Sequence, residues 1–365
     1  MELTKIVITG GPCAGKSTAM SRIQKEFSAL GYTVLFVPET ATELITGGVA
    51  PWTCGRNVEY QKCQMRLQLV KEALFEQAAR TMPAEKMLIV CDRGNLDNKA
   101  YMDEDEFAEA LEYIGLNKVE LRDNYDAVFH LVTAAKGEER FYTTENNSAR
   151  IETVEQATAL DDRLIDAWTG HPHFRVIDNS EDFEEKMARL IKEISVFLGE
   201  PEKRETERKF LIERPDISLL ESIPACRHID ILQTYLKSEK DEEIRVRRRG
   251  EDGHYVYFHT VKRKINGLKR EENERRITKE EYLSLLEEAD ESKKPISKTR
   301  YCLTYKNQYL EIDIYPFMND TAILEIELCD GDEEIFFPES IKVIKEVTFD
   351  DEYKNSSLAA KIQDK

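Results

Sequence analysis

The chain of 365 residues carries 71 acidic and 52 basic side chains, a formal charge of −19, and 34% of its residues are charged. This balance excludes a disordered tail and argues against nucleic acid as a partner, and the length predicts two domains. No apolar run approaches the roughly 18 residues that a membrane helix needs. The N-terminus enters a strand-like run without a secretory leader, so we expect a cytoplasmic protein.

The first half alternates short apolar runs with amphipathic stretches, a rhythm typical of parallel strands joined by crossover helices. Strands are expected at residues 6–9, 34–38, 87–91, 127–133 and 174–177. Helices are expected at residues 17–30, 60–81, 153–168 and 184–198. The pattern predicts a doubly wound α/β domain that binds a nucleoside triphosphate, over residues 1–199.

A phosphate-binding loop follows the first expected strand. Its sequence, GGPCAGKS, matches the pattern G-x-x-x-x-G-K-[ST] between an apolar run and an amphipathic helix. The glycines let backbone N–H groups turn toward a phosphate, Lys16 reaches the β and γ oxygens, and Ser17 ligates Mg²⁺. The residues expected to bind the nucleotide here are Gly10, Gly11, Gly15, Lys16, Ser17 and Thr18.

Two strand ends carry residues suited to phosphoryl chemistry. Asp92 ends an apolar strand, as expected of a carboxylate that holds Mg²⁺ through water. Arg93 follows it, and Glu39 ends the second strand at the same carboxyl edge. Small-molecule P-loop kinases use an acid and an arginine at these places, as base and phosphoryl clamp, so Glu39 and Arg93 are candidate catalytic residues. An exposed strand-end salt bridge explains them equally well.

Later residues of this half are weaker candidates for nucleotide contacts. Arg140 and Arg150 lie in a polar stretch where a lid would bring arginine to the developing phosphate charge, although either could be a solvated loop residue. Asn179 follows the fifth strand, where it could contact the base or simply form a turn.

From residue 204 the hydrophobic period changes to two, after a polar linker that contains proline. Strands are expected at residues 205–212, 243–249, 255–264, 269–276, 298–304, 309–315 and 322–328. The pattern Thr278-x-x-Glu281 opens one helix between them. Because the strands carry charge on one face and apolar residues on the other, we expect a barrel with a polar lumen.

The charged face combines both signs. Its basic members are Lys209, Arg245, Arg247, Lys262, Arg270, Lys298 and Arg300. Its acidic members are Glu205, Glu207, Glu311, Asp313, Glu325 and Glu327. Buried rows of like charge need neutralising partners, which a polyphosphate with Mg²⁺ or Mn²⁺ supplies. The alternative is a solvated, salt-bridged face of an antiparallel sheet.

The order and spacing of these charges resemble the CYTH, or triphosphate tunnel metalloenzyme, family over residues 204–365. The matching motifs are Glu205-x-Glu207-x-Lys209, Arg245-x-Arg247, Thr260-x-Lys262, Arg270-x-Glu272-x-Glu274, Lys298-x-Arg300, Glu311-x-Asp313, Glu325-x-Glu327 and Glu346-Val-Thr. Members hydrolyse inorganic, thiamine or nucleoside triphosphates, or cyclise ATP, in an eight-stranded tunnel. The resemblance implies metal roles for the Glu205/Glu207 and Glu325/Glu327 pairs and phosphate contacts for the basic residues, with Lys209 at the catalytic centre.

The first half resembles AAA/NadR kinase-like ATPase domains, in particular the P-loop domain of the TRPL translocation-defect proteins, which a CYTH domain follows. The motifs are the phosphate loop, Asp92-Arg93-Gly94, Asn146-Asn147-x-x-Arg150 and Ile177-Asp-Asn179. Gly94 stands where deoxynucleoside kinases usually have serine, a departure from their acceptor site.

Three functional hypotheses follow. The leading one is a protein that binds ATP or GTP and hydrolyses a triphosphate in a metal-dependent tunnel. The second is a nucleotide-regulated sensor that binds a polyphosphate or phosphoinositide headgroup without turnover; it is suggested by the similarity of the TRPL proteins to GTP- and phosphoinositide-binding trafficking factors. The third is a small-molecule kinase. Tunnel enzymes often pair, so the resemblance leaves a homodimer open.

Overall fold

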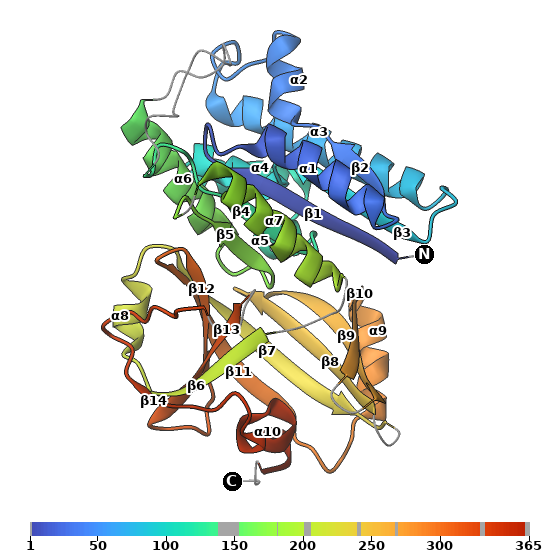
Figure 1. The fold of residues 1–365 in the computed structure, drawn as a ribbon, viewed down its shortest axis with the longest axis vertical. Coiled ribbons are helices and arrows are strands. Elements are labelled where there is room, and N and C mark those ends of the chain that lie inside the picture. Colours follow the sequence, from blue (N-terminus) through green and yellow to red (C-terminus); the bar gives the residue numbers. More distant parts are fainter. Residues whose placement is uncertain are drawn as a thin grey trace. The chain divides into compact units, whose positions relative to one another are not determined.

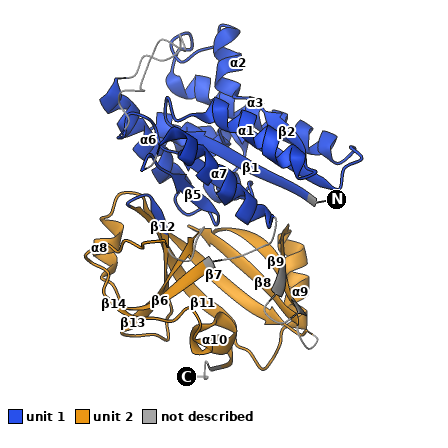
Figure 2. Ribbon diagram, viewed as in Figure 1, with its two compact units in different colours: residues 1–205, 306–309 blue, residues 206–305, 310–365 orange. Residues whose placement is uncertain are grey.

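The computed structural model describes residues 2–137, 153–180, 182–200, 206–238, 242–266, 269–328 and 333–361; at residues 2, 206, 264–266, 269–272 and 361 it describes the backbone alone. Two compact units result (Figure 2). Unit 1 comprises residues 1–205 with 306–309, and unit 2 comprises residues 206–305 with 310–365. The functional assignment of the two predicted domains, residues 1–199 and 204–365, stays a prediction.

Unit 1 contains a five-stranded parallel sheet in the order β2-β3-β1-β4-β5 (Figure 1). The strands are β1 (Glu2–Gly10), β2 (Thr33–Val37), β3 (Lys86–Asp92), β4 (Ala127–Leu131) and β5 (Phe174–Ile177). The helices are α1 (Lys16–Ala29), α2 (Thr40–Thr46), α3 (Asn57–Ala79), α4 (Glu104–Ile114), α5 (Lys118–Arg122), α6 (Val154–Trp168) and α7 (Phe183–Leu198), with a 3-10 helix at Asn95–Tyr101. The predicted α/β architecture is confirmed.

The central position of β1 determines where the phosphate loop lies. β1 is flanked by β3 and β4, so the segment that follows Gly10 lies between the carboxyl ends of those two strands. Ile6 and Ile8 are fully buried and pack in one cluster with Phe27 of α1 and Leu190 of α7. The loop therefore stands on a rigid apolar base.

Helix ends in unit 1 follow local sequence chemistry. The side chain of Thr153 accepts from the Gln156 backbone N–H at the start of α6, and that of Asp182 accepts from the Glu185 N–H at the start of α7. Such caps satisfy backbone donors that the first helical turn leaves without partners. α7 ends at Gly199, the stop that the sequence predicts.

Unit 2 is built on a nine-stranded antiparallel sheet in the order β10-β9-β8-β7-β11-β12-β13-β6-β14. Its strands are β6 (Thr206–Glu213), β7 (Cys226–Leu236), β8 (Glu242–Glu251), β9 (His254–Asn266), β10 (Lys269–Ile277), β11 (Ile296–Tyr305), β12 (Gln308–Ile314), β13 (Thr321–Leu328) and β14 (Val343–Glu346). The helices are α8 (Ile217–Glu221), α9 (Lys279–Leu285) and α10 (Asn355–Lys361), and 3-10 turns lie at Leu286–Glu288 and Asp351–Tyr353. The predicted antiparallel β domain is confirmed, but it has nine strands rather than eight.

The two strands that the sequence reading left out are β7 and β14. β7 lies between β8 and β11 near the middle of the sheet, and most of its side chains are buried. Because both of its faces are covered toward its end, from Gln233 to Leu236, its alternation is weak there.

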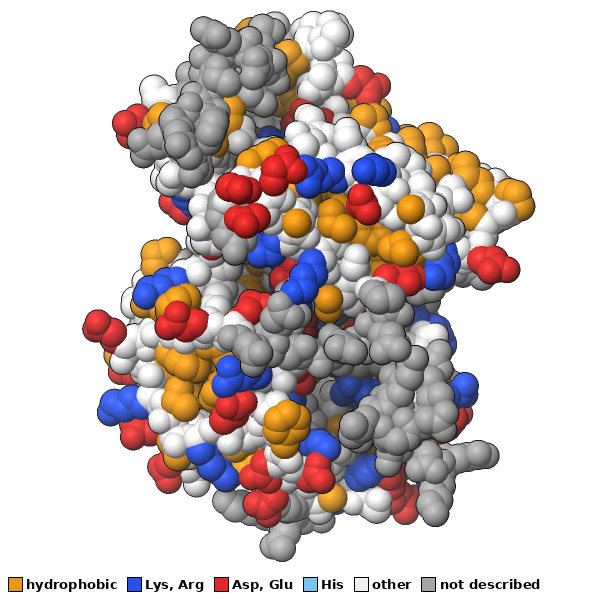
Figure 3. Space-filling model, viewed as in Figure 1, with side chains coloured by type: hydrophobic (Ala, Val, Ile, Leu, Met, Phe, Trp, Pro, Cys, Tyr) orange, Lys and Arg blue, Asp and Glu red, His pale blue; other side chains and the backbone are white. Residues whose placement is uncertain are grey.

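No helix of the described ranges is both long and apolar enough to cross a membrane. Among the side chains drawn in colour in Figure 3, acidic and basic groups are interspersed on the visible face of each unit. That face carries no continuous basic stripe of the kind by which many proteins bind nucleic acid.

Candidate functional site

The phosphate loop connects β1 to α1 and is shaped by Gly15. Gly15 has a φ of 94° at the N-terminus of α1, and a Cβ there would lie 2.7 Å from Cε2 of Phe183. Only glycine adopts this conformation without strain, so the loop can turn into the helix at this point. The first turn of α1 then carries Lys16 and the exposed Ser17, and their contacts with a nucleotide stay a prediction.

Lys16 lies folded across the loop that precedes it. Its Nζ donates to the carbonyl oxygen of Gly10 at 3.1 Å and to that of Gly11 at 3.4 Å. Burial, followed by repulsion from the neighbouring Arg93, lowers the pKa of Lys16 to about 8. The lysine is therefore a desolvated cation whose present acceptors are weak neutral carbonyls.

Asp92 supplies an acid beside this cation. Its Oδ1 is buried and has no hydrogen-bond partner among the described residues, and burial raises the pKa of the carboxyl group. A buried acceptor without a donor is rare in proteins and is usually satisfied by an ordered water or an ion. A carboxylate and the hydroxyl of Ser17 are oxygen donors of the kind that Mg²⁺ takes, so these residues fit the cation that the phosphate loop implies.

Glu39 and Arg93 form an ion pair at the mouth of the loop. Nε of Arg93 donates to Oε1 of Glu39 at 2.6 Å, and its Nη1 lies 3.3 Å from the Gly10 carbonyl and 3.5 Å from Oδ2 of Asp97. Burial raises the pKa of Glu39, but Arg93 and Lys16 outweigh it and lower the pKa to about 2. The pair is thus fully charged at neutral pH, and the structure brings it to the phosphate loop.

Three more buried polar atoms of unit 1 lack partners within the part of the chain that the structure describes. They are Oγ1 of Thr40, the hydroxyl of Tyr60 and Oε1 of Gln61, in side chains that are each at most 3% exposed. Thr40 begins α2 directly after Glu39, and the charge of Glu39 is one cause of the raised pKa of Tyr60. The sequence did not indicate these residues, because a buried polar atom without a hydrogen-bond partner can be recognised only in the folded structure.

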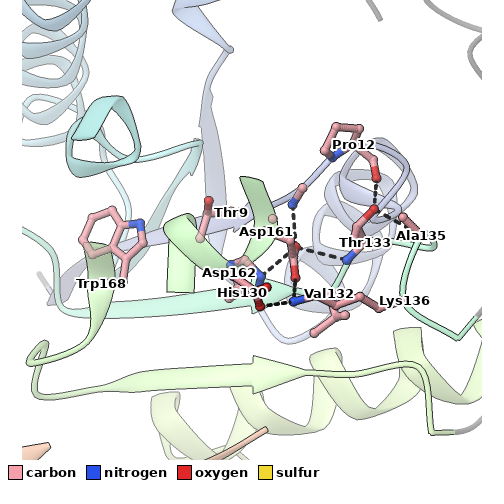
Figure 4. A network of polar contacts seen from close by, with 12 residues as sticks. Thr9, Pro12, His130, Val132, Thr133, Ala135, Lys136, Asp161, Asp162 and Trp168 are labelled. Carbon is pink, nitrogen blue, oxygen red and sulfur yellow. Dashed lines mark hydrogen bonds and ion pairs between the residues drawn. The ribbon is translucent and has the colours of Figure 1, made fainter. Parts of the chain in front are cut away.

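A buried polar network lies beneath the loop, centred on Asp161 of α6 (Figure 4). Oδ1 of Asp161 accepts from the backbone N–H of Gly11 at 3.0 Å and from that of Thr133 at 3.1 Å. The same oxygen lies 3.0 Å from Nε2 of His130, and Oδ2 accepts from Nζ of Lys136 at 2.9 Å. Sequence reasoning missed Asp161; its signal was an acid on the apolar face of a predicted amphipathic helix.

Asn179 lies beside this network. Its Nδ2 donates to the carbonyl oxygens of Thr133 and Lys136, both at 2.8 Å, and its Oδ1 accepts from Nζ of Lys186. The amide thus holds the loop after β4 and is fully engaged by protein groups. Arg140 and Arg150 lie outside the described residues.

The register of unit 2 gathers its predicted acids on three neighbouring strands. Glu325 on β13 pairs with Glu311 on β12 and with Lys209 on β6, and Glu327 pairs with Glu207. Glu205 and the side chain of Arg270 lie outside the description.

Arg300 is the centre of this charged cluster. Its Nε and Nη2 each donate to Asp313 at 2.7 Å, and it also contacts Glu311 and Glu325. Lys298 donates to the same Asp313, which is completely buried. Asp313 is thus occupied in holding two cations in place.

The pKa values of two glutamates of the cluster are shifted in opposite directions. Burial and the charge of Glu325 raise the pKa of Glu207 to about 7. Burial also acts against ionisation of Glu325, but Lys209 and Arg300 outweigh it and hold its pKa well below the usual range. Among the described side chains, no group of three or more His, Cys, Asp or Glu is arranged to hold a metal ion. The metal role of these acids stays a prediction.

A basic row continues the same face. Ile231 on β7 pairs with Lys298 on β11 and with Arg249 on β8, so these three residues share one face of the sheet. With a period of two, Arg247 lies on that face as well, and its Nη2 donates to Oε1 of Glu274 at 2.9 Å. Burial lowers the pKa of Arg247, and the neighbouring arginines lower it further. Such a concentration of cations suits an anion with several charges.

Two other predicted phosphate residues lie on the neighbouring part of this sheet. Arg245 pairs with Thr260, and Lys262 of β9 pairs with Glu243 of β8 and with Glu272 of β10. The structure thus places the predicted basic residues whose side chains it describes on β6, β8, β9 and β11.

Comparison with known proteins supports the description of unit 1, through a match to a protein-family model. A search of curated proteins finds no match. Among solved structures, an inorganic triphosphatase is 27% identical, covering 44% of this chain and 96% of its own with a TM-score of 0.32. Thymidylate kinase from Candida albicans is 15% identical, covering 53% of this chain and 92% of its own with a TM-score of 0.39. Both TM-scores lie below 0.5, so function is inferred from the residues above. Residues 5–186 match a family model described as an AAA domain, and the N-terminal half of the chain therefore carries a P-loop AAA domain.

Proposed function

We propose that unit 1 binds a Mg²⁺–nucleoside triphosphate, ATP or GTP, at the phosphate loop, and that unit 2 binds and hydrolyses a triphosphate with a divalent metal. The observation that carries the first part is the pairing of Lys16 with Gly10 and Gly11 carbonyls beside the unpartnered oxygen of Asp92. Among the described residues, neither group has a strong ionic hydrogen-bond partner of the kind that a metal-bound polyphosphate supplies.

Binding at the loop would rearrange few groups. Lys16 turns from the loop carbonyls to the β and γ phosphate oxygens, while the N–H groups at the start of α1 donate to the β phosphate. Ser17 and, through water, Asp92 would hold Mg²⁺, which neutralises part of the phosphate charge. Arg93 lies close enough to the Gly10 carbonyl to reach the transferred phosphoryl group.

In unit 2, the charged cluster supports a binding step in which ligand and protein charges exchange partners. A triphosphate takes donors from Arg300 and Lys209, which now bind Glu311 and Glu325. The released carboxylates, with Glu207, Glu327 and Glu205, would then ligate Mg²⁺ or Mn²⁺, whose chemistry is to polarise the terminal phosphoryl group. The order of a phosphate-loop domain and a CYTH-like domain, as in the TRPL proteins that the sequence resembles, agrees with two phosphate sites.

The test is phosphate release from a panel of triphosphates with Mg²⁺ and with Mn²⁺. Lys16→Ala is compared with Lys25→Ala on the exposed surface of α1, and Glu207→Gln with Glu213→Gln, an exposed position on the same strand. Release that is lost in Glu207→Gln alone supports hydrolysis in unit 2. Loss in Lys16→Ala alone places hydrolysis at the phosphate loop, and no release from any substrate contradicts an enzymatic role.

A second candidate function, small-molecule phosphotransfer, is favoured by two buried oxygens close to Glu39, those of Thr40 and Tyr60, which have no partner among the described residues. An acceptor hydroxyl would attack the γ phosphorus, its proton would pass to the carboxylate of Glu39, and the bond to the β-phosphate oxygen would break. With a pKa of about 2, Glu39 is a weak base, which a loose transition state tolerates.

This candidate predicts nucleotide consumption that depends on an added polyhydroxylated acceptor. Glu39→Gln should abolish the acceptor-dependent part while nucleotide binding persists. Consumption that is independent of every acceptor counts against phosphotransfer and in favour of hydrolysis.

A further inference from the structure

Asp161 of α6 is a buried carboxylate on which donors from three other segments converge. Gly11 belongs to the phosphate loop, His130 to β4, and Thr133 to the loop that follows β4. The hydroxyl of Thr133 in turn donates to the carbonyl of Pro12 at 2.5 Å. Gly11 and Pro12, two consecutive residues of the phosphate loop, thus form hydrogen bonds with residues outside the motif.

The charge of Asp161 is balanced locally. Its second oxygen binds Lys136, and burial is outweighed by His130 and Lys136, which together hold the pKa of Asp161 below its usual range. Lys136 also contacts Asp162, the next residue, whose side chain is 66% exposed and makes no hydrogen bond with the loop among the described residues. The two adjacent acids share a lysine, but only Asp161 reaches Gly11.

The same helix contacts the opposite side of the nucleotide site. Trp168 lies two turns after Asp161, and its Nε1 donates to Oδ1 of Asp97 at 2.5 Å. Oδ2 of Asp97 accepts from Thr9 at 2.6 Å and lies 3.5 Å from Nη1 of Arg93. One face of α6 therefore supports both the loop and the arginine beside it.

We propose that Asp161 is a positioning residue for nucleotide binding, which holds the phosphate loop in its binding conformation from α6. The proposal rests on the proposed binding of a nucleoside triphosphate at residues 10–17. A loop that begins with two glycines has a large conformational entropy, and fixing it on binding would weaken affinity. By accepting the Gly11 N–H, Asp161 orders the loop beforehand, and the nucleotide then meets a preorganised site.

The test compares Asp161→Asn with Asp162→Asn in the full chain. In Asp161→Asn, the new amide either turns its NH₂ toward Lys136, a donor facing a donor, or turns it toward Gly11 and loses that bond. We expect the Kd for Mg²⁺–ATP and Mg²⁺–GTP, measured by calorimetry, to rise about tenfold, whereas Asp162→Asn should leave it within about twofold.

Amide hydrogen exchange separates positioning from a general loss of stability. In Asp161→Asn without nucleotide, exchange at Gly11 and Thr133 should become faster while exchange at Ile6 and Ile8 of β1 stays as slow as in the parent chain. Unchanged exchange at Gly11, equal affinity losses in the two variants, or faster exchange throughout β1 would each overturn the proposal. If the parent chain binds no nucleotide, the proposed function fails, and the positioning role of Asp161 fails with it. Protection of Gly11 by Asp161 would then show only that the hydrogen bond stabilises the loop.

Discussion

The indole of Trp168 occupies the space that a side chain at residue 94 would need. A Cβ at Gly94 would lie 2.4 Å from Cζ2 and 2.7 Å from Cη2 of Trp168. The φ of Gly94 is −99°, a conformation open to any residue, so packing and not backbone strain requires glycine here. The tryptophan thus excludes the serine that deoxynucleoside kinases usually have at this position. We expect Gly94→Ser to lower the free energy of unfolding by about 3 kcal/mol in urea denaturation, because overpacking a filled site displaces its neighbours.

Two further variants check that the ring is the cause. Gly55→Ala, at a position with no heavy atom within 4 Å of the added Cβ, should change stability by less than about 0.5 kcal/mol. Gly94→Ser should cost clearly less in a Trp168→Phe background, since phenylalanine lacks both clashing atoms. Equal costs in both backgrounds would show that Trp168 is not responsible.

Sequence patterning predicted what depends on local periodicity and missed what depends on burial. The strands of unit 1 contain short apolar runs, and the phosphate loop is a contiguous motif, so both were predicted close to their observed positions, although β1 begins at Glu2 and not at residue 6. β7 was missed because its last residues, from Gln233 to Leu236, are buried on both faces and do not alternate. Asp161 was missed because the partners that make a buried acid stable, Gly11 and Thr133, are 150 and 28 residues away in the chain.

The ion pair of Glu39 and Arg93 predicts a dependence of stability on pH. Because the folded-state pKa of Glu39 is about 2 and its ordinary value is 4.5, its stabilisation is complete above pH 4.5 and is lost as the pH falls from 4.5 toward 2. Glu39→Gln should therefore lower the free energy of unfolding by about 2 kcal/mol at pH 6.5, and the difference from the parent chain should shrink at pH 3.5.

Glu43→Gln is the matched control for this titration. Glu43 lies on α2, the helix that begins directly after Glu39, and forms an ion pair with Lys71, but its side chain is 59% exposed. Exposed pairs are worth little, so the difference between this variant and the parent should be small at both pH values. A Glu39→Gln difference that is the same at pH 6.5 and pH 3.5 would contradict the assigned pKa.

Asp313 predicts a large effect in unit 2, because it is a fully buried acid between two cations. Asp313→Asn leaves Lys298 without its buried counter-charge and removes at least one of the two bonds from Arg300, because the amide has a single acceptor oxygen. We expect a loss of about 3 kcal/mol in unfolding free energy, as when one partner of a buried ion pair is removed. Glu213→Gln, which breaks an exposed pair with Lys342, should cost less than about 0.5 kcal/mol. Similar costs for both would mean that Asp313 does not hold the two cations in place.

Arg247 provides the test that separates ligand binding from stability in unit 2. Its Nε has no hydrogen-bond partner among the described residues, and its ion pair with Glu274 is offset by burial and by the neighbouring arginines, which lower its pKa. Its charge therefore contributes little to stability without a ligand. Arg247→Met should change the unfolding free energy by less than about 1 kcal/mol. In calorimetry with inorganic tripolyphosphate and Mg²⁺, however, the Kd should rise at least about tenfold, because a phosphate oxygen loses a charge-assisted donor.

The matched control is Arg263→Met, at an exposed position of β9 whose side chain pairs with Glu242, and it should leave the Kd for tripolyphosphate unchanged. Because Arg263 pairs directly opposite Glu242, one residue out of step with the row of Arg245 and Lys262, it lies on the other face of the sheet. Equal effects of the two substitutions would mean that tripolyphosphate is attracted by overall charge, and the assignment of the charged face as its site would be wrong.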